Sequence, residues 1–176
     1  MSLLSDVRTL VRPARPDEFD AVGHLALRAY AHDYALAGPY AASVADAAGR
    51  AAEHELVVAV DALEGTLLGT VTLPRPGRNC SAVSRPGEMD LRLLATDPAA
   101  RGRGVATSLV EHALAVGRQR GLDRLVLASQ ARMVAAHRLY ERLGFARLAE
   151  REVHVLADGR VHVYGRDLGA GVRVPR

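Results

Sequence analysis

The chain has no lysine, no isoleucine and no tryptophan, and it has one cysteine, Cys80, among 176 residues. A single cysteine cannot form an internal disulfide, and it provides no Cys-x-x-Cys pair for a metal or for redox chemistry. Without lysine there is no Walker A phosphate loop, no Schiff-base nucleophile and no anchor for pyridoxal phosphate. All 23 basic side chains are therefore arginines.

Long apolar runs are also missing. No stretch approaches the ~18 residues that a membrane-spanning helix needs. Residues 1–16 contain no basic stretch followed by an apolar core, which is the pattern of a secretory leader. We therefore expect a cytoplasmic protein with no membrane partner. The seven histidines show no His-x-x-x-His or similar spacing with acids, so we expect no metal site.

The excess of positive charge is mild. The formal net charge is +3 at pH 7, and the arginines are spread along the chain. With no motif that interleaves aromatic and basic residues, this distribution argues against nucleic acid as a partner and mildly favours a small anionic ligand. A basic nucleic-acid-binding domain is the weaker alternative.

The chain has the composition of one globular domain, with 24% charged and 49% hydrophobic residues. We find no internal repeat and no low-complexity linker that would divide it. We therefore predict a single domain over residues 1–168. Residues 169–176 contain glycine and proline, and we expect them to form a short flexible tail.

Alternation and helical periodicity predict strands and helices in mixed order. Strands are expected at 7–12, 56–60, 66–73, 88–96 and 124–129, with a terminal hairpin over 145–156 and 160–168 around Asp158-Gly159. Helices are expected at 17–30, 40–53, 106–120 and 132–143. The apolar face of the segment 40–53 is small, so we expect this helix at the surface. The irregular segment 74–87 has the length of a functional or mobile loop.

A turn after the strand 88–96 is the strongest candidate for ligand binding. A strand that leads through glycines into a helix can point backbone N–H groups at one anion, and the helix N-terminus adds about half a positive charge. The two arginines of the turn add fixed positive charge. The predicted pyrophosphate-binding residues are Arg101, Gly102, Arg103, Gly104, Val105, Ala106 and Thr107.

The strand before this turn carries two carboxylates. Alternation over residues 88–96 places Glu88, Asp90 and Arg92 on one face together with Leu94 and Thr96. An ordinary solvated strand face with a salt bridge is one interpretation of this pattern. The other is a pair of acids beside the glycine turn, available for proton transfer.

Two motifs resemble those of the GNAT superfamily of acetyl-CoA-dependent N-acetyltransferases. The first is the acyl-CoA turn Arg/Gln-x-x-Gly-x-Gly/Ala, matched by Arg101, Gly104 and Ala106. The second is Ala-x-x-Leu-Tyr-x-x-x-Gly-Phe, matched over residues 136–145. The resemblance implies an α/β (α+β) fold with a central mostly antiparallel sheet of about six to seven strands. A parallel splayed pair is expected at the cofactor site, with about four flanking helices.

The resemblance also implies roles for named residues. Tyr140 is similar to the family's general acid, which protonates the departing thiolate of coenzyme A. The strand residues Leu94, Ala95 and Thr96 would pair with the pantetheine arm. A phenol of pKa ~10 suits this proton transfer, although an aromatic residue on a core-facing helix stripe is more commonly a packing residue. His137 follows Ala136, and we expect it to point into solvent.

The departures from the family pattern are two. Met133 stands where many members have an asparagine that helps to bind the pantetheine arm, and Thr96 stands where valine is more usual.

The incoming amine must lose a proton, and Glu88 or Asp90 is the expected acceptor, directly or through water.

The acceptor is not readable from the sequence beyond an amine of a small molecule or of a protein. Polar candidates for binding it are Tyr30, Asp33, Tyr34 and Tyr40, in and beside the segment 28–42. Packing at the edge of the core is the alternative for the tyrosines. An acyl-CoA-binding sensor without turnover, and transfer of a longer acyl group, also remain open. We expect a monomer or a homodimer.

Overall fold

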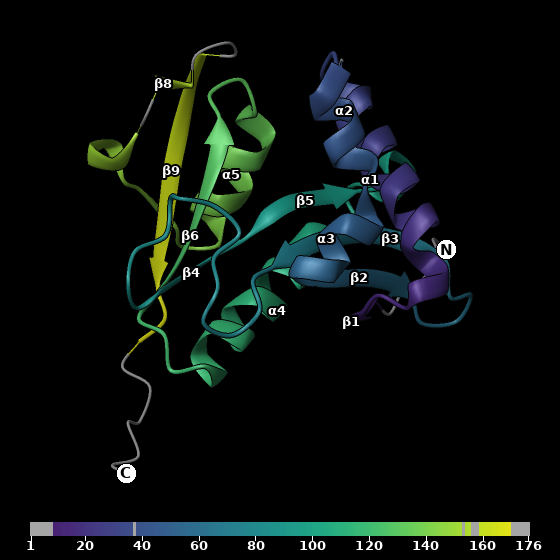
Figure 1. Ribbon diagram of the computed structural model, residues 1–176, viewed down its shortest axis with the longest axis horizontal. Helices are drawn as coiled ribbons and strands as arrows, with labels where there is room; N and C mark the ends of the chain where they lie inside the picture. Colours follow the sequence, from purple (N-terminus) through teal and green to yellow (C-terminus); the bar gives the residue numbers. More distant parts are fainter. Residues whose placement is uncertain (1–8, 37, 153, 156–158, 170–176) are drawn as a thin grey trace, which may run out of the picture. The chain divides into compact units, whose positions relative to one another are not determined.

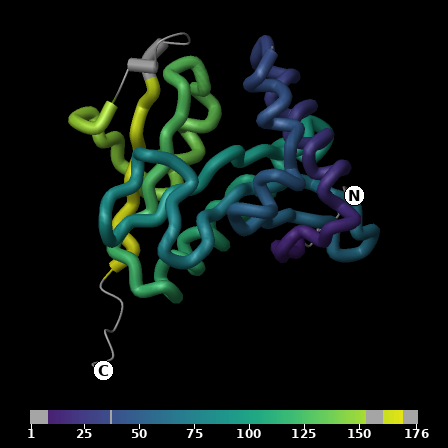
Figure 2. Tube along the Cα trace, in the orientation of Figure 1, coloured from purple at the N-terminus to yellow at the C-terminus, as the bar shows by residue number. Residues whose placement is uncertain are grey.

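The computed structural model describes residues 9–36, 38–152, 154–155 and 159–169. Within this part of the chain there are nine β-strands and five α-helices (Figure 1). They form two compact units, the first of Met1–Thr72 and Leu93–Val110 and the second of Leu73–Arg92 and Glu111–Arg176. The trace in Figure 2 can be followed through both. The predicted tail lies outside the described residues from residue 170 onward.

The first unit contains one four-stranded sheet with the order β1-β2-β3-β5. Its strands are β1 (Thr9–Pro13), β2 (Glu55–Asp61), β3 (Leu67–Leu73) and β5 (Arg92–Thr96). The last residue of β3 and the first residue of β5 belong to the second unit. β1 is antiparallel to β2, with Thr9 paired with Asp61 and Pro13 with Val57. The nearly continuous apolar run in β2 is buried, as its sequence predicts.

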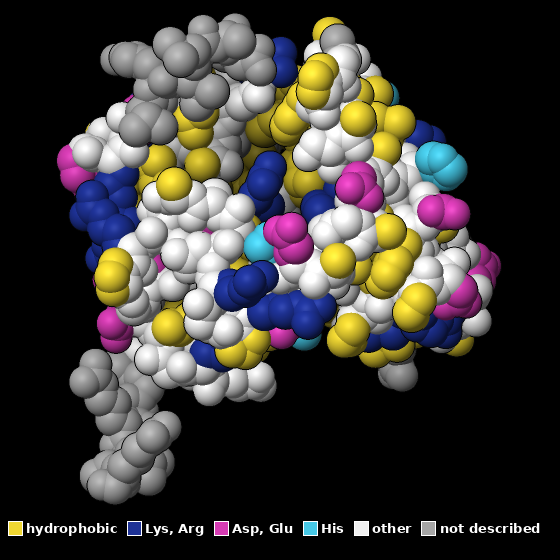
Figure 3. Space-filling model, in the orientation of Figure 1, with side chains coloured by type: hydrophobic (Ala, Val, Ile, Leu, Met, Phe, Trp, Pro, Cys, Tyr) yellow, Lys and Arg dark blue, Asp and Glu magenta, His cyan; other side chains and the backbone are white. Residues whose placement is uncertain are grey.

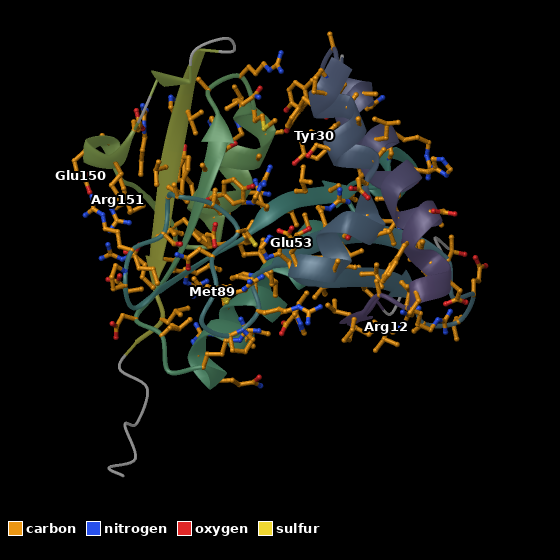
Figure 4. The ribbon with its side chains drawn as sticks, in the orientation of Figure 1. Arg12, Tyr30, Glu53, Met89, Glu150 and Arg151 are labelled. Carbon is orange, nitrogen blue, oxygen red and sulfur yellow. The ribbon has the colours of Figure 1, made fainter. Side chains whose placement is uncertain are left out.

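Three helices of this unit precede the second strand, namely α1 (Phe19–Asp33), α2 (Gly38–Ala45) and α3 (Ala47–Glu53). The apolar stripe of α1 supplies core residues, among them Val22, Leu25 and Ala26. A short 3-10 turn (Pro16–Glu18) leads into α1, and Arg12 of β1, labelled in Figure 4, donates two hydrogen bonds to Glu18. The hydrogen bonds from Arg12 lower the pKa of Glu18 to about 2.

The predicted helix over 40–53 is two helices. Asp46 separates them because its carboxylate accepts a hydrogen bond from the Gly49 N–H and caps α3. The expectation of a surface helix is also wrong in part, since Val44 and Ala47 are buried. A Cβ on Gly23 would lie 2.1 Å from the Ala45 carbonyl oxygen, so this glycine allows α1 and α2 to approach closely.

The second unit contains a five-stranded sheet with the order β4-β6-β9-β7, in which β8 pairs with β9. The elements are β4 (Glu88–Asp90), β6 (Arg124–Gln130), α5 (Val134–Arg142), β7 (Ala146–Arg147), a 3-10 turn (Ala149–Arg151), β8 (His154–Val155) and β9 (Gly159–Asp167). Helix α4 (Val105–Gln119) begins in the first unit and ends in the second. β4 and β6 are parallel, and the chain between them runs through β5 and α4, as a strand–helix–strand order favours. The predicted turn at Asp158 lies outside the described residues.

The strand predicted over 88–96 is broken at Leu91, and its halves join different sheets. Leu93 has a φ of 50°, the only positive value at a non-glycine position among the described residues. A residue with this left-handed backbone interrupts the pleat of the strand. The alternation of side chains between two faces, predicted across residues 88–96, therefore does not hold. The α/β class is confirmed, but the single sheet of six to seven strands is instead one sheet of four and one of five.

Among the described residues, no helix combines the length and the apolar character needed to cross a membrane.

Candidate cofactor and catalytic sites

The turn between β5 and α4 has two glycines in the left-handed region. Gly102 and Gly104 both have a φ of 76°. A Cβ at either position would meet nothing within 4 Å, so the backbone conformation, and not crowding, requires glycine there. Residues 101–104 are all exposed. The backbone of the turn is therefore open to a ligand.

Helix α4 begins directly after this turn. Its first hydrogen bond runs from the Ser108 N–H to the Gly104 carbonyl at 3.0 Å. Within the described ranges, no group accepts a hydrogen bond from the N–H groups of Val105, Ala106 or Thr107. Three unpaired donors at the positive end of a 15-residue helix form a suitable site for a phosphate oxygen.

Both arginines of the turn are paired with carboxylates of the same unit. Arg101 donates to Asp33 through Nη1 (3.0 Å) and Nη2 (2.8 Å), and its Nη2 also donates to the Ala29 carbonyl at 3.3 Å. Arg103 lies 3.4 Å from the Asp61 carboxylate. The face in Figure 3 likewise shows acidic side chains interspersed with arginines. The free positive charge of the turn is therefore smaller than the sequence suggests.

Strand β5 ends the sheet of the first unit, so the described strands pair with one of its edges only. The left-handed Leu93 lies just before Leu94, Ala95 and Thr96, the three predicted pantetheine partners. Tyr30 of α1, labelled in Figure 4, has its hydroxyl 3.5 Å from the Leu94 carbonyl. An edge strand with backbone groups available is the arrangement that an extended amide ligand needs.

Tyr140 lies in the last turn of α5 in the second unit. Its side chain is 6% exposed, and its ring contacts those of Phe145 and Tyr164, with centroids 5.9 and 5.7 Å away. After α5 the chain turns at Gly144, which has a φ of 77°, and the Phe145 N–H donates to the Tyr140 carbonyl. The motif residues Tyr140, Gly144 and Phe145 thus form one packed helix end.

Glu88 is held in a buried ion pair. Both of its oxygens accept hydrogen bonds from Arg151, labelled in Figure 4, at 2.8 Å, and both side chains are 8% exposed. Burial raises the pKa of Glu88, but hydrogen bonds from Arg151 and from the Arg85 N–H outweigh it, so the pKa lies below its ordinary value. These contacts favour a structural role.

Glu88 is also distant from Tyr140 along the sheet. It is paired with Arg124 of β6, whereas Tyr164, which contacts Tyr140, is paired with Leu127. Three residues along a strand span about 10 Å. Proton transfer from an amine near Tyr140 to Glu88 would therefore need intervening water.

Asp90 is completely buried. Its Oδ1 accepts a hydrogen bond from the Cys80 N–H at 2.8 Å, and its Oδ2 accepts one from the Ser81 hydroxyl at 2.7 Å. It is paired with Val126, one residue from the level of Tyr164. Asp90 fixes the segment 74–87 to β4, and the prediction that it or Glu88 acts as the base stays a prediction.

A model of the acetyltransferase (GNAT) family matches residues 16–145, more than half of the chain. The chain belongs to this family. Among curated GNAT relatives, the mycothiol acetyltransferase of Salinispora tropica is 43% identical over 106 residues, which are 58% of this chain and 30% of that protein. The chain spans a third or less of the length of the curated relatives it matches.

Solved GNAT structures share the fold. A GNAT acetyltransferase from Staphylococcus aureus Mu50 has a TM-score of 0.71 at 12% identity, covering 92% of this chain and 99% of its own. A putative acetyltransferase from Salmonella typhimurium, solved with its cofactor acetyl-CoA, has a TM-score of 0.64 at 18% identity, covering 91% and 94%. GNAT proteins generally bind acetyl-CoA, and the Salmonella protein was solved with it as its cofactor.

Within this GNAT chain, sequence reasoning missed a cluster around His137. The prediction of a solvated side chain is wrong: His137 is 8% exposed, and its ring packs at a tilt against those of His162 and Tyr164 of β9, with centroids 5.0 and 5.3 Å away. Burial lowers the pKa of His137. His162 and Tyr164 are two residues apart and share one face of β9, so the alternation of that strand could have indicated an aromatic surface for α5.

The predicted acceptor-binding residues lie in the first unit. Tyr30 and Tyr34 have ring centroids 6.4 Å apart near the end of α1, where Asp33 is bound to Arg101. Tyr40 lies on α2 and is 37% exposed. Their role in binding an amine stays a prediction. Tyr30 and Asp33 thus lie on α1, Tyr34 directly follows it, and Tyr40 lies on α2.

Burial raises the pKa of the Cys80 thiol to about 12, which disfavours the thiolate that a nucleophile needs. The described residues contain no group of three or more His, Cys, Asp or Glu side chains that could hold a metal ion.

Proposed function

We propose that the chain transfers an acetyl group from acetyl-CoA to the primary amine of a small molecule or protein. The observation that carries the proposal is the turn itself. Two left-handed glycines lead into a helix whose first three N–H groups have no partner in the described chain, directly after an edge strand. This is a donor set for a pyrophosphate followed by backbone groups for amides. A cytoplasmic location and the oligomeric state stay predictions.

The residues present fit the cofactor on these grounds. The N–H groups of Val105, Ala106 and Thr107 would hold the pyrophosphate, and the free edge of Leu94 to Thr96 would hold the pantetheine amides. Arg101 acts through Asp33 by fixing the turn to α1, with its charge already shared. Acetyl-CoA supplies an activated thioester when it is bound.

Tyr140 is the proposed general acid. Its phenol would donate a proton to the sulfur of the departing thiolate, because the two groups have similar basicity. The rings of Phe145 and Tyr164 fix its orientation. The amine would lose its proton to water. That water could pass the proton on to Asp90 or Glu88, the two acceptors predicted from the sequence.

A binding module without turnover is the second candidate. The observation that favours it is that both carboxylates predicted as bases already have protein partners. A chain that binds acyl-CoA without an available base would act as a sensor. Transfer of longer acyl groups is a variant of the first proposal, because the turn contacts only the pyrophosphate.

Thiol release from acetyl-CoA, followed across a panel of primary amines, separates these candidates. We expect amine-dependent release, with kcat lowered by about 10²-fold in Tyr140→Phe and with unchanged affinity for coenzyme A. Coenzyme A binding without release on any amine, and without an effect of Tyr140→Phe, would support the sensor instead. Acetyl-, butyryl- and octanoyl-CoA compared on the best amine define the acyl chain.

A further inference from the structure

A pocket lies in the second unit, apart from most of the residues proposed for acetyl transfer. Residues of the segment 74–89, together with Arg120 and Leu122 just after α4, line a pocket of about 550 Å³. This volume lies within the range of small-molecule sites, roughly 300–1,000 Å³. Of the proposed cofactor and catalytic residues, only Glu88 is among those that line it.

The lining of this pocket is strongly positive. It contains four arginines, Arg75, Arg78, Arg85 and Arg120, and a single carboxylate, that of Glu88. Arg151 neutralises Glu88 through two hydrogen bonds of 2.8 Å, and Arg124 lies 3.8 Å from the same carboxylate. The residues that line the pocket therefore carry more positive than negative charge.

Two of these arginines are available to a ligand. Arg78 and Arg85 are exposed, and among the described residues no group accepts a hydrogen bond from either guanidinium. A guanidinium presents paired donors that match the oxygens of a phosphate or a carboxylate. Two such groups lining one pocket favour a ligand with more than one negative group.

The segment that carries them is fixed in place. The buried Asp90 carboxylate accepts hydrogen bonds from Cys80 and Ser81, and Arg120 donates to the Pro74 carbonyl at 2.6 Å. The Arg85 N–H donates to Glu88 at 3.0 Å. Hydrogen bonds hold the segment at its middle and near both ends. Little backbone entropy is therefore lost when a ligand binds to its arginines.

We propose that this pocket binds a small organic phosphate that carries at least two phosphate groups. The pocket has charge in excess, and the residues lining it include no aromatic side chain on which a base could stack. A concave site without a stacking surface fits a compact phosphate ester better than a single-stranded nucleic acid. The inference does not depend on acetyl transfer.

Calorimetric titration of the full chain with fructose 1,6-bisphosphate tests the proposal, with coenzyme A present at saturation so that the turn of the first unit is occupied. We expect one site whose affinity falls at least about tenfold in the Arg78→Gln/Arg85→Gln double variant. Arg142→Gln, an exposed arginine of α5 outside the pocket, is the matched control and leaves the affinity unchanged. Both substituted arginines are exposed, so we expect the double variant to fold, and thermal unfolding checks this. If the double variant does not fold, the two single variants replace it in the titration.

Four outcomes would overturn the proposal. They are no binding below about 10 mM, equal binding by the double variant, loss of binding when coenzyme A is added, and tighter binding of citrate or of a short single-stranded oligonucleotide than of the bisphosphate. A chain that binds the bisphosphate but not coenzyme A would leave this site standing and contradict the proposed acetyl transfer.

Discussion

The Arg101 guanidinium and the Asp33 carboxylate form a two-pronged ion pair, with N–O distances of 3.0 and 2.8 Å, between the glycine turn and the end of α1. Sequence reasoning gave these two residues different tasks, one for the cofactor and one for the acceptor. Their pairing means that Arg101 contributes to the turn mainly by position, while the backbone N–H groups after it remain the anion donors.

The first prediction concerns this pair. Asp33→Asn releases Arg101 from α1, so we expect the KM for acetyl-CoA to rise by about two- to fivefold, the range of a surface pair worth up to about 1 kcal/mol. Arg101→Ala is expected to have a similar effect, and the double variant no more than either alone. Steady-state kinetics of the three variants measures this. Tighter acetyl-CoA binding in Asp33→Asn would instead show that Arg101, once freed, binds phosphate directly.

The second prediction concerns the left-handed backbone of the turn. Gly104→Ala places a Cβ at a φ of 76° in open space, so the cost is backbone strain of about 1–2 kcal/mol and no clash. We expect lower stability together with weaker binding of coenzyme A, since the donors of α4 shift. Gly65→Ala is the matched control, because Gly65 has a φ of 71° and equally open surroundings in the turn between β2 and β3.

For the control we expect the same loss of stability, measured by urea unfolding, with unchanged binding of coenzyme A. Equal binding by both variants would remove the turn from the cofactor site.

The third prediction separates structure from catalysis at Glu88. Glu88→Gln leaves Arg151 buried without its charge partner, so we expect the free energy of unfolding to fall by about 3–5 kcal/mol. The kcat of the remaining folded protein should stay within about threefold of the wild-type value, because Glu88 is distant from Tyr140 along the sheet. Glu152→Gln is the control, since its partner Arg147 is half-exposed and such a pair is worth about 1 kcal/mol or less.

A fall in kcat of about 10²-fold or more in stable Glu88→Gln protein would identify Glu88 as the base after all.

The fourth prediction is a pH dependence of stability at His137. Burial lowers its folded pKa, His162 and Arg147 lower it further, and the Gln130 carbonyl and Glu141 partly oppose them. The unfolded chain therefore binds the proton more readily. Stability is expected to be full above the unfolded pKa of about 6.5 and to fall as the pH drops through and below it, by at most about 1.4 kcal/mol per pH unit.

Urea unfolding at pH 7.5, 6.5 and 5.5 measures this loss. His137→Phe keeps the aromatic packing and should flatten the profile, whereas His24→Gln, at an exposed position of α1, should not. Parallel profiles for wild type and His137→Phe would show that His137 does not couple folding to protonation.

Much of the fold could be predicted from local patterns. The buried run of β2 and the amphipathic helix α4 follow from the periodicity of their apolar residues. Gly104 and Gly121 mark the two ends of α4, and the strand–helix–strand order favours the parallel pairing of β4 with β6. The break at Leu91 could not be predicted, because the segment 88–96 alternates like a continuous strand and only the left-handed Leu93 shows where the pleat changes. Asp46 within an alanine-rich helix was the available sign that α2 and α3 are separate.

The backbone conformation of the candidate site could be predicted where a motif specifies it. The hydrogen-bond partners of its charged side chains could not. Gly102 and Gly104 have the left-handed backbone that the glycine turn implied, whereas the role of Tyr140, taken from the resemblance to the GNAT family, stays a prediction. The partners of Arg101, Glu88 and Asp90 come from distant segments, and no local pattern specifies them. Buried His137 was missed because its position on the helix was judged from one neighbour instead of from the residues of β9 that face it.

Mass spectrometry of the amine product tests the central claim most directly. The full chain is incubated with acetyl-CoA labelled in the acetyl group and with the best amine of the panel, and free thiol is measured in the same samples. We predict one labelled acetyl group on the amine for each thiol released, with both falling together in Tyr140→Phe. Thiol released without labelled amine, or no thiol released on any amine, would contradict acetyl transfer by this chain.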